Sequence, residues 1–209
     1  MKNRIGIFLV LLMIPVSGFS QEKLSENEQK AFKQKVLTTA QSITSIQSDF
    51  TQTKHLSVLE NEIISEGKLY FKSPSLVKWE YITPYKNSSI FTNDKLFVNN
   101  EGKKDEMDLS SNRMFKSLNT LIVNSIKGDM FDESQFGISY FGTTNGYLVK
   151  FIPKDKRLKK FISSFELQFD KASAQVTQIK LLEPNDDNTT IVFKNKQINT
   201  HIPDTVFKN

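Results

Sequence analysis

The chain has 209 residues and a formal net charge of +5, and 38% of its residues are hydrophobic against 24% charged. This length and composition are typical of one globular domain, and the chain is too short for two large domains. With no cysteine and two histidines, the sequence excludes a disulfide scaffold, thiolate catalysis and a zinc site built from Cys or from several His residues. The 17 phenylalanines, against 5 tyrosines and 1 tryptophan, indicate a large apolar interior.

The first twenty residues are typical of a secretory signal peptide. Lys2 and Arg4 precede an apolar run over residues 5–16, which is too short to span a bilayer. We therefore expect cleavage near Ser20/Gln21 and a mature protein in the periplasm; the alternative is an uncleaved anchor. Loss of the two basic residues lowers the formal charge from +5 to +3, which gives no reason to expect nucleic acid binding.

Residues 21–209 are interpreted as a single domain that begins with a helix. Ser25 and Glu28 have the spacing of a capping box. The following residues share one apolar stripe at helical spacing, made of Phe32, Val36, Ala40 and Ile43. We expect this helix to cover part of a sheet.

Alternating apolar and polar residues predict strands after Ser45. The strands expected here are one from Ile46, one over residues 63–72, one from Leu76 to Thr83, and a hairpin of Ser89–Thr92 with Lys95–Asn99 around Asn93-Asp94. In the clearest of them Val77, Trp79 and Tyr81 face one way, with Lys78 and Glu80 on the other side. The charged run from Glu101 to Asp108 is interpreted as a solvated loop.

A second helix is predicted between Ser110 or Ser111 and Gly128. Its apolar face consists of Met114, Leu118, Leu121, Ile122 and Ile126. From Phe136 onward the period is two again, which predicts consecutive antiparallel strands. The fold class is therefore mainly β with α: a strongly curved antiparallel sheet, covered by the first helix, with the second helix as a plug or lid.

Catalytic motifs are absent from the sequence. There is no G-x-S-x-G elbow, P-loop, G-x-G-x-x-G or H-E-x-x-H. The acid clusters Asp186-Asp187 and 105–108 lie in turn-like stretches, where carboxylates are usually solvated. His55 has no acidic neighbour in sequence, and His201 is interpreted as a tail residue. We expect no catalytic residue, no metal, no cofactor and no enzyme activity.

Two features of the sequence can be interpreted either as ordinary parts of the fold or as binding surfaces. The apolar face of the sheet is by default ordinary core, but a curved sheet can also enclose a cavity for an apolar ligand. The basic stretch over residues 154–160 is either a solvated loop or a surface that touches an anionic membrane or partner.

Particular strings resemble a known family. They are Phe50-Thr51-Gln52, then Gly67-Lys68-Leu69-Tyr70-Phe71-Lys72-Ser73-Pro74, then Val77-Lys78-Trp79-Glu80-Tyr81 with Pro84. They resemble the F-x-Q, G-x-L-x-x-x-x-P and W-x-aromatic pattern of the periplasmic lipoprotein carriers, the LolA family. Ile202 to Phe207 is similar to the closing segment of the family.

The resemblance implies an unclosed β-barrel with a hydrophobic cavity that shields acyl chains. The partners it implies are acylated lipoproteins, an inner-membrane lipoprotein-releasing transporter and an outer-membrane acceptor, with the carrier itself a monomer. We expect the cavity to be lined by Leu69, Phe71, Val77, Trp79 and Tyr81, and the lid to present Met114, Leu118, Leu121 and Ile122. Each acyl CH₂ kept from water is worth about 0.8 kcal/mol, so an apolar cavity suffices for binding.

One position departs from the family. The better known carriers have an arginine before the proline of the motif, which bonds to the lid, whereas this chain has Ser73, preceded by Lys72. With a short hydroxyl there, we expect the lid equilibrium to lie further towards open.

Two alternatives to the lipoprotein carrier stay open. One is a periplasmic lipid-sensing or regulatory module of the same fold. The other is a carrier of a free lipid or a lipid-linked pigment.

Overall fold

The computed structural model describes residues 21–92, 94–109, 124, 126 and 128–209. The helical elements whose bounds are described are α1 (Glu26–Gln41) and the short 3₁₀ helices η1 (Leu158–Lys160) and η2 (Asp204–Phe207), and Asn124 and Ile126 are also helical. The strands of the first half are β1 (Glu22–Lys23), β2 (Ser45–His55), β3 (Ile63–Lys72), β4 (Leu76–Thr83), β5 (Asn87–Phe91), β6 (Lys95–Asn100) and β7 (Lys103–Asp108). Those of the second half are β8 (Phe136–Thr143), β9 (Gly146–Pro153), β10 (Ser164–Asp170), β11 (Val176–Leu182) and β12 (Asn188–Ile198).

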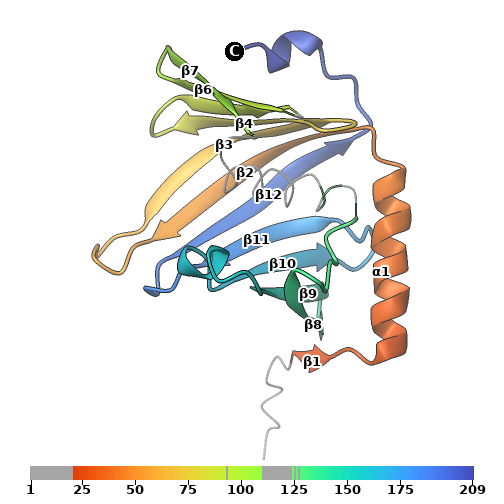
Figure 1. The fold of residues 1–209 in the computed structure, drawn as a ribbon. Coiled ribbons are helices and arrows are strands. Elements are labelled where there is room, and N and C mark those ends of the chain that lie inside the picture. The colour runs from red at the N-terminus through yellow and green to blue at the C-terminus, as the bar shows by residue number, and fades with distance from the viewer. Residues whose placement is uncertain (1–20, 93, 110–123, 125, 127) are drawn as a thin grey trace, which may run out of the picture.

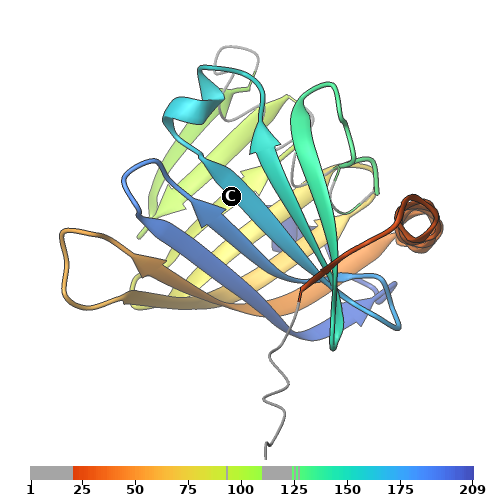
Figure 2. The ribbon, with the colours of Figure 1, turned by 90° about the horizontal axis from the view of Figure 1, so that it is seen from below.

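All twelve strands form one antiparallel sheet. Their order is β1-β8-β9-β10-β11-β12-β2-β3-β4-β5-β6-β7, so the pair of β12 and β2 joins the two halves of the chain. The sheet bends strongly and α1 runs along one side of it (Figure 1). Seen end-on, the two halves of the sheet curl around a common interior (Figure 2). The sheet is not closed into a barrel, because β1 and β7 remain at its two ends. The predicted fold class is confirmed.

The capping box that the sequence predicts begins α1. The Ser25 hydroxyl accepts from the backbone N–H of Glu28, and the Glu28 carboxylate accepts from the backbone N–H of Ser25 at 2.8 Å. Phe32 and Val36 of the predicted stripe are buried. The Phe32 ring packs against Phe169 of β10, with ring centroids 5.1 Å apart. The helix is therefore held against the second half of the sheet.

The sequence strings that resemble the family meet in space around Gly67. A Cβ on Gly67 would lie 2.1 Å from the carbonyl oxygen of Glu80 and 2.6 Å from the Phe50 ring, so the strands approach too closely here for any side chain. Phe50 packs edge-on against Tyr81, whose hydroxyl donates to the Gln52 amide oxygen at 2.9 Å. This contact set explains why these residue types recur together in the strings.

The charged run from Glu101 to Asp108 is not the predicted loop. Lys103–Asp108 forms β7, which pairs with β6 along its whole length, and Lys95 bonds to Glu106 at 2.5 Å. Alternation failed as a signal because β7 is an edge strand whose two faces are largely exposed.

Most of the predicted second helix falls outside the described residues, including Met114, Leu118, Leu121 and Ile122. Its expected end is described. Gly128 has a positive φ of 79°, and the N–H of Asp129 donates to the Asn124 carbonyl at 3.0 Å. This backbone agrees with a helix that ends at Gly128.

Buried apolar side chains form two clusters rather than one. The first lies between α1 and strands β8 to β11, with Phe151 and Phe165 stacked 4.5 Å apart at its centre. The second lies on strands β2 to β6 and β12 around Phe50 and Trp79. Within the described part of the chain, no helix has both the length and the apolar character that crossing a bilayer requires.

Candidate functional site

A cavity of about 350 Å³ lies where the two apolar clusters meet. The residues that line it are Val36, Thr39, Ala40, Ile43, Ile46, Leu69, Trp79, Tyr81, Ser89, Phe91, Ile126, Ile162, Phe165, Leu167, Phe169, Ala174, Gln175, Val176, Ile179, Leu181, Ile191, Phe193 and Lys196. Most of these side chains are apolar, and Lys196 is the one charged residue among them. As far as the described residues line it, the cavity is thus a mainly apolar space with one cationic group.

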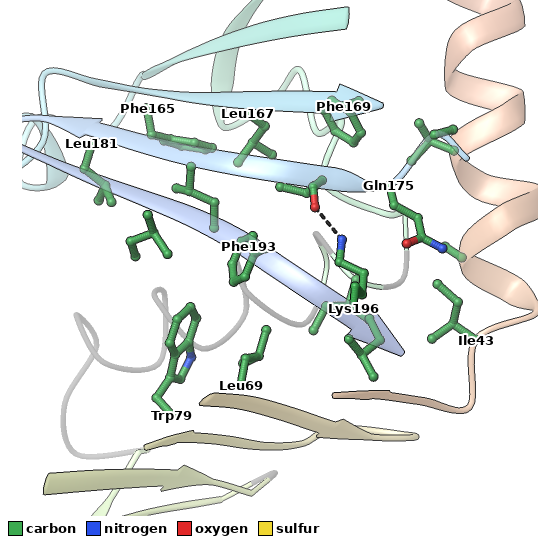
Figure 3. A pocket seen from close by; sticks show the side chains of 18 of the residues that line it. Ile43, Leu69, Trp79, Phe165, Leu167, Phe169, Gln175, Leu181, Phe193 and Lys196 are labelled. Atoms are coloured by element: carbon green, nitrogen blue, oxygen red, sulfur yellow. Dashed lines mark hydrogen bonds between the residues drawn. The ribbon is translucent and has the colours of Figure 1, made fainter. Parts of the chain in front are cut away.

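The period of the strands explains how the lining is built. Phe165, Leu167 and Phe169 are alternate residues of β10 and all point to the same side (Figure 3). Leu69 of β3 and Trp79 of β4 lie across the cavity from them, as register partners in adjacent strands. Side chains from both halves of the sheet therefore enclose the same space.

The five predicted cavity residues divide into two groups. Leu69, Trp79 and Tyr81 line the cavity, and burial raises the pKa of the Tyr81 phenol. Phe71 and Val77 do not line it. Their exposed fractions are 1% and 0%, because they pack on each other as register partners inside the second cluster. Val77 is therefore a core residue, and Phe71 borders the smaller cavity described next.

Ser73 borders a second, smaller cavity of about 260 Å³ together with Ile126 and Asp129. Its backbone N–H donates to the Thr44 carbonyl at 2.9 Å. Lys72, considered above as a neighbour of this position, forms an ion pair with Asp204 at the start of η2. The expected effect of Ser73 on the lid stays a prediction.

Most of the described lining residues, Phe165, Leu167, Phe169 and Lys196 among them, were not predicted as cavity residues, and Lys196 differs from the rest by its charge. Its ammonium donates to the Val176 carbonyl oxygen at 2.5 Å, and it lies 5.7 Å from the centroid of the Phe193 ring. Burial lowers the pKa of Lys196 to about 8, and the negative charge of Asp170 opposes part of this shift. The cavity therefore holds an ammonium that is poorly solvated.

A β-bulge in β12 directs Lys196 into the cavity. Lys194 pairs with Asp49 and Gln197 pairs with Gln47, so Asn195 and Lys196 together stand opposite the single residue Ser48. Asn195 has a positive φ of 50°, as one residue of such a bulge often does. Strict alternation from Phe193 would place Lys196 on the outer face.

Trp79 brings an unpaired polar group to the cavity wall. The residue is 8% exposed, and its indole Nε1 is buried without a hydrogen-bond partner among the described residues. A buried N–H donor without an acceptor is unfavourable, so a ligand oxygen at this position would be stabilised.

The other polar candidates have structural roles. Asp187 is buried, in contrast to the expected solvated carboxylate, and accepts from the backbone N–H of Ser57 at 2.6 Å, a bond that lowers its pKa. His55 ends β2, and His201 is exposed beyond β12. Across the positions that the structure describes, no group of three His, Asp or Glu side chains is placed to hold a metal ion.

The basic stretch over residues 154–160 is a surface segment that ends in η1. Its basic side chains are exposed. Lys154 bonds to the Glu133 carbonyl at 2.6 Å, and Arg157 pairs with Asp155 at 3.3 Å. The segment is adjacent to Ile162, which lines the cavity.

Comparison with known sequences gives a family match. The family model described as outer membrane lipoprotein carrier protein LolA matches residues 41–209. The outer-membrane lipoprotein carrier protein of Methylococcus capsulatus is 24% identical over 152 residues, which cover 71% of this chain and 68% of that protein.

Solved structures with the same fold are distant in sequence. An uncharacterized conserved protein from Thermus thermophilus has a TM-score of 0.54 at 11% identity, with 87% of this chain and 93% of the other covered. The MucA/MucB complex of Pseudomonas aeruginosa contains a chain with a TM-score of 0.51 at 10% identity, with 87% of this chain and 61% of that chain covered. These similarities concern the fold alone.

Proposed function

This chain belongs to the LolA family of outer membrane lipoprotein carriers, and on that premise we propose that it is a periplasmic carrier of acylated lipoproteins. In this proposal the acyl chains occupy the cavity between the two apolar clusters. The observation that carries the proposal is an apolar cavity formed jointly by both halves of an unclosed sheet. Such a space keeps hydrocarbon from water without any chemical step.

The proposed route follows from the energetics of an acyl chain in water. Each buried CH₂ contributes about 0.8 kcal/mol, so a cavity of about 350 Å³ offers several kcal/mol of binding. A lipoprotein would be received from a transporter in the inner membrane and passed to an acceptor at the outer membrane. The signal peptide would be removed near Ser20/Gln21 before the carrier works in the periplasm.

Two adjacent leucines of β11 give a matched test. Leu181 lines the cavity, whereas Leu182 lies on the other face of the strand, and both are half-buried. Leu181→Glu should weaken the binding of a fluorescent acyl probe at least tenfold, because a carboxylate beside the hydrocarbon either loses hydration or takes up a proton. Leu182→Glu should retain the affinity of the unmodified protein.

The folded state of both variants is checked by circular dichroism before binding is measured. Equal loss of affinity in two folded variants would contradict acyl binding in this cavity. Native mass spectrometry of the protein purified from its own periplasm then identifies the cargo. Co-purified acylated lipoprotein is the expected result.

A regulatory module of the same fold is the second candidate. The fold likeness to a chain of the MucA/MucB complex favours it, since that complex joins two proteins. The same mass spectrometry separates the candidates. A protein partner without acyl-bearing material would support the regulatory module, and a free lipid without protein would support the carriage of lipids alone.

A further inference from the structure

We infer that the cavity selects an acyl ligand that carries an anionic group, a carboxylate or a phosphate, and that Lys196 binds this group. The inference rests on the acyl-binding cavity of the proposed function. The ligand class that it assigns favours the free-lipid alternative named there, because the acyl chains of a lipoprotein are joined through neutral esters and an amide. It adds a charged anchor to a site whose other described lining residues are apolar or uncharged.

The first support is that the β-bulge in β12 directs the Lys196 side chain into the cavity. Without the bulge, β12 would continue its alternation and leave Lys196 outside with Lys194, which bonds to Thr51 on the outer face. The bulge is held in place, since the Ser48 hydroxyl donates to the Lys194 carbonyl at 2.8 Å. The Asn195 amide also donates to Asp49 at 2.9 Å. Bulges of this kind re-aim side chains at functional sites.

The second support is that the ammonium has no counter-ion in the protein. Every Asp and Glu of the sequence lies among the described residues, and Lys196 forms no ion pair with any of them. Asp170, whose charge acts on Lys196, bonds to Ser173 instead. Buried charges in proteins are ordinarily paired, so a ligand anion is the partner that completes the site.

The third support is the position of Lys196 within the cavity. Lys196 and Gln175 lie at the end next to α1, whereas Trp79 and Phe165 lie towards the other end (Figure 3). A ligand with an anionic head and a hydrocarbon tail fits this polarity with the head at Lys196. Among the described residues the Val176 carbonyl is the one acceptor for the ammonium, which leaves two N–H groups for the head group.

A neutral acyl ligand forms weaker hydrogen bonds to the Lys196 ammonium and does not balance its charge. An ester or amide carbonyl offers one neutral acceptor, whereas a carboxylate or phosphate offers a charge-assisted bond that is about twice as strong. A neutral ligand in the cavity would also displace water from the ammonium without replacing its charge interaction. The geometry therefore favours an acidic amphiphile over an uncharged one of the same length.

Trp79 provides a direct readout of binding. It is the only tryptophan of the sequence and it lines the cavity, so its fluorescence reports occupancy. The probes are decanoate, decyl phosphate and decanol, which share one chain length and differ in the head group. At pH 7 we expect decanoate, decyl phosphate or both to bind at least tenfold more tightly than decanol, since a hydrogen bond to a charged group is worth about 1.5–3 kcal/mol.

Three variants assign the preference to one side chain. Lys196→Met should lose the preference for the anions and bind decanol at least as tightly as the unmodified protein does, because no ammonium then loses water to the neutral ligand. Lys196→Arg should retain the preference. Lys194→Met is the matched control, because Lys194 is two residues away on the outer face, and it should behave as the unmodified protein. Decanol binding by Lys196→Met also shows that its cavity is intact.

The outcomes separate this inference from the proposed function. Equal affinity for decanol and both anions in the unmodified protein, or a preference that survives Lys196→Met, overturns the anionic site and leaves the acyl cavity standing. Failure of all three probes to bind overturns both. A preference for decyl phosphate over decanoate identifies a phosphate head group, and the reverse identifies a fatty acid.

Discussion

At the scale of single residues, Gly67 sets the spacing of three strands. Gly67→Ala would place a methyl group against the backbone oxygen of Glu80 and the ring of Phe50. We expect the free energy of unfolding to fall by about 1–3 kcal/mol, as for other overpacked sites. Gly137→Ala in β8 is the control, since its Cβ meets only one atom, at 3.9 Å. Urea unfolding of both variants measures the effect, and equal stabilities would mean that the close approach at Gly67 is relaxed easily.

Lys196 gives a prediction about stability against pH. Its folded pKa of about 8 lies below the ordinary value of 10.5, so the unfolded chain binds more protons between these values and stability rises with pH across this window. Lys196→Met removes this penalty and should raise the unfolding free energy at pH 7 by about 1–3 kcal/mol, since each pKa unit corresponds to about 1.4 kcal/mol.

The advantage of Lys196→Met should shrink above pH 8 and vanish above pH 10.5. The negative charge of Asp170, at the end of β10, acts on Lys196, and Lys35 of α1 donates to the carbonyl of the neighbouring Lys171. Asp170 and Lys35 are therefore left unchanged in both proteins that are compared. Urea unfolding at several pH values measures the difference. A stability gap that does not depend on pH would contradict the assignment to the ammonium.

At the scale of elements, the bulge in β12 gives a further prediction. Asn195 adopts a positive φ of 50°, which β-branched residues tolerate poorly. Asn195→Val should lower the unfolding free energy by about 1–2 kcal/mol and weaken the preference for decanoate. Asn195→Gly, which accepts this backbone conformation, should retain the preference. The measurements are urea unfolding and Trp79 fluorescence, and an unaltered preference in a folded Asn195→Val would show that the bulge does not aim Lys196.

Most strands and the first helix could be predicted from the sequence, and the exceptions have physical reasons. Alternation located β4 and β10 because in each strand the apolar face is more deeply buried than the polar face, and the capping box at Ser25 located the start of α1. Alternation failed for β7, where both faces are largely exposed. It also failed at Lys196, because an inserted residue reverses the side on which each later side chain lies.

For the candidate site, alternation could indicate a face of the sheet but not the position of the cavity. A period of two assigns Leu69, Phe71, Val77, Trp79 and Tyr81 to one face of the sheet, but it does not say where along that face a cavity opens. That depends on how far the sheet bends, and hence on contacts between residues distant in sequence. Val77 lies where neighbours fill the space and Phe71 borders the smaller cavity, whereas Leu69 and Trp79 lie where the two apolar clusters leave a gap.

At the scale of the whole molecule, the cavity exists because the two halves have separate cores. Each half packs its own aromatic cluster, and the halves are joined through the pair of β2 and β12. The family match begins at Gln41, the last residue of α1, so Val36, Thr39 and Ala40 belong to the cavity wall but precede the matched range. The apolar stripe of α1 therefore contributes to the cavity from outside the range that the family model matches.

An unclosed sheet leaves backbone donors and acceptors at its rim, and such rims invite other chains to add strands. β1 offers only two residues to an incoming strand. β7 is longer, but five of its six side chains are charged and exposed, namely Lys103, Lys104, Asp105, Glu106 and Asp108. A strand from another chain that paired with β7 would have to desolvate several of these charged groups. The same charges that remove the apolar alternation from β7 thus disfavour the addition of a strand from another chain. In a closed barrel no such protection would be needed, because no edge strand would be exposed.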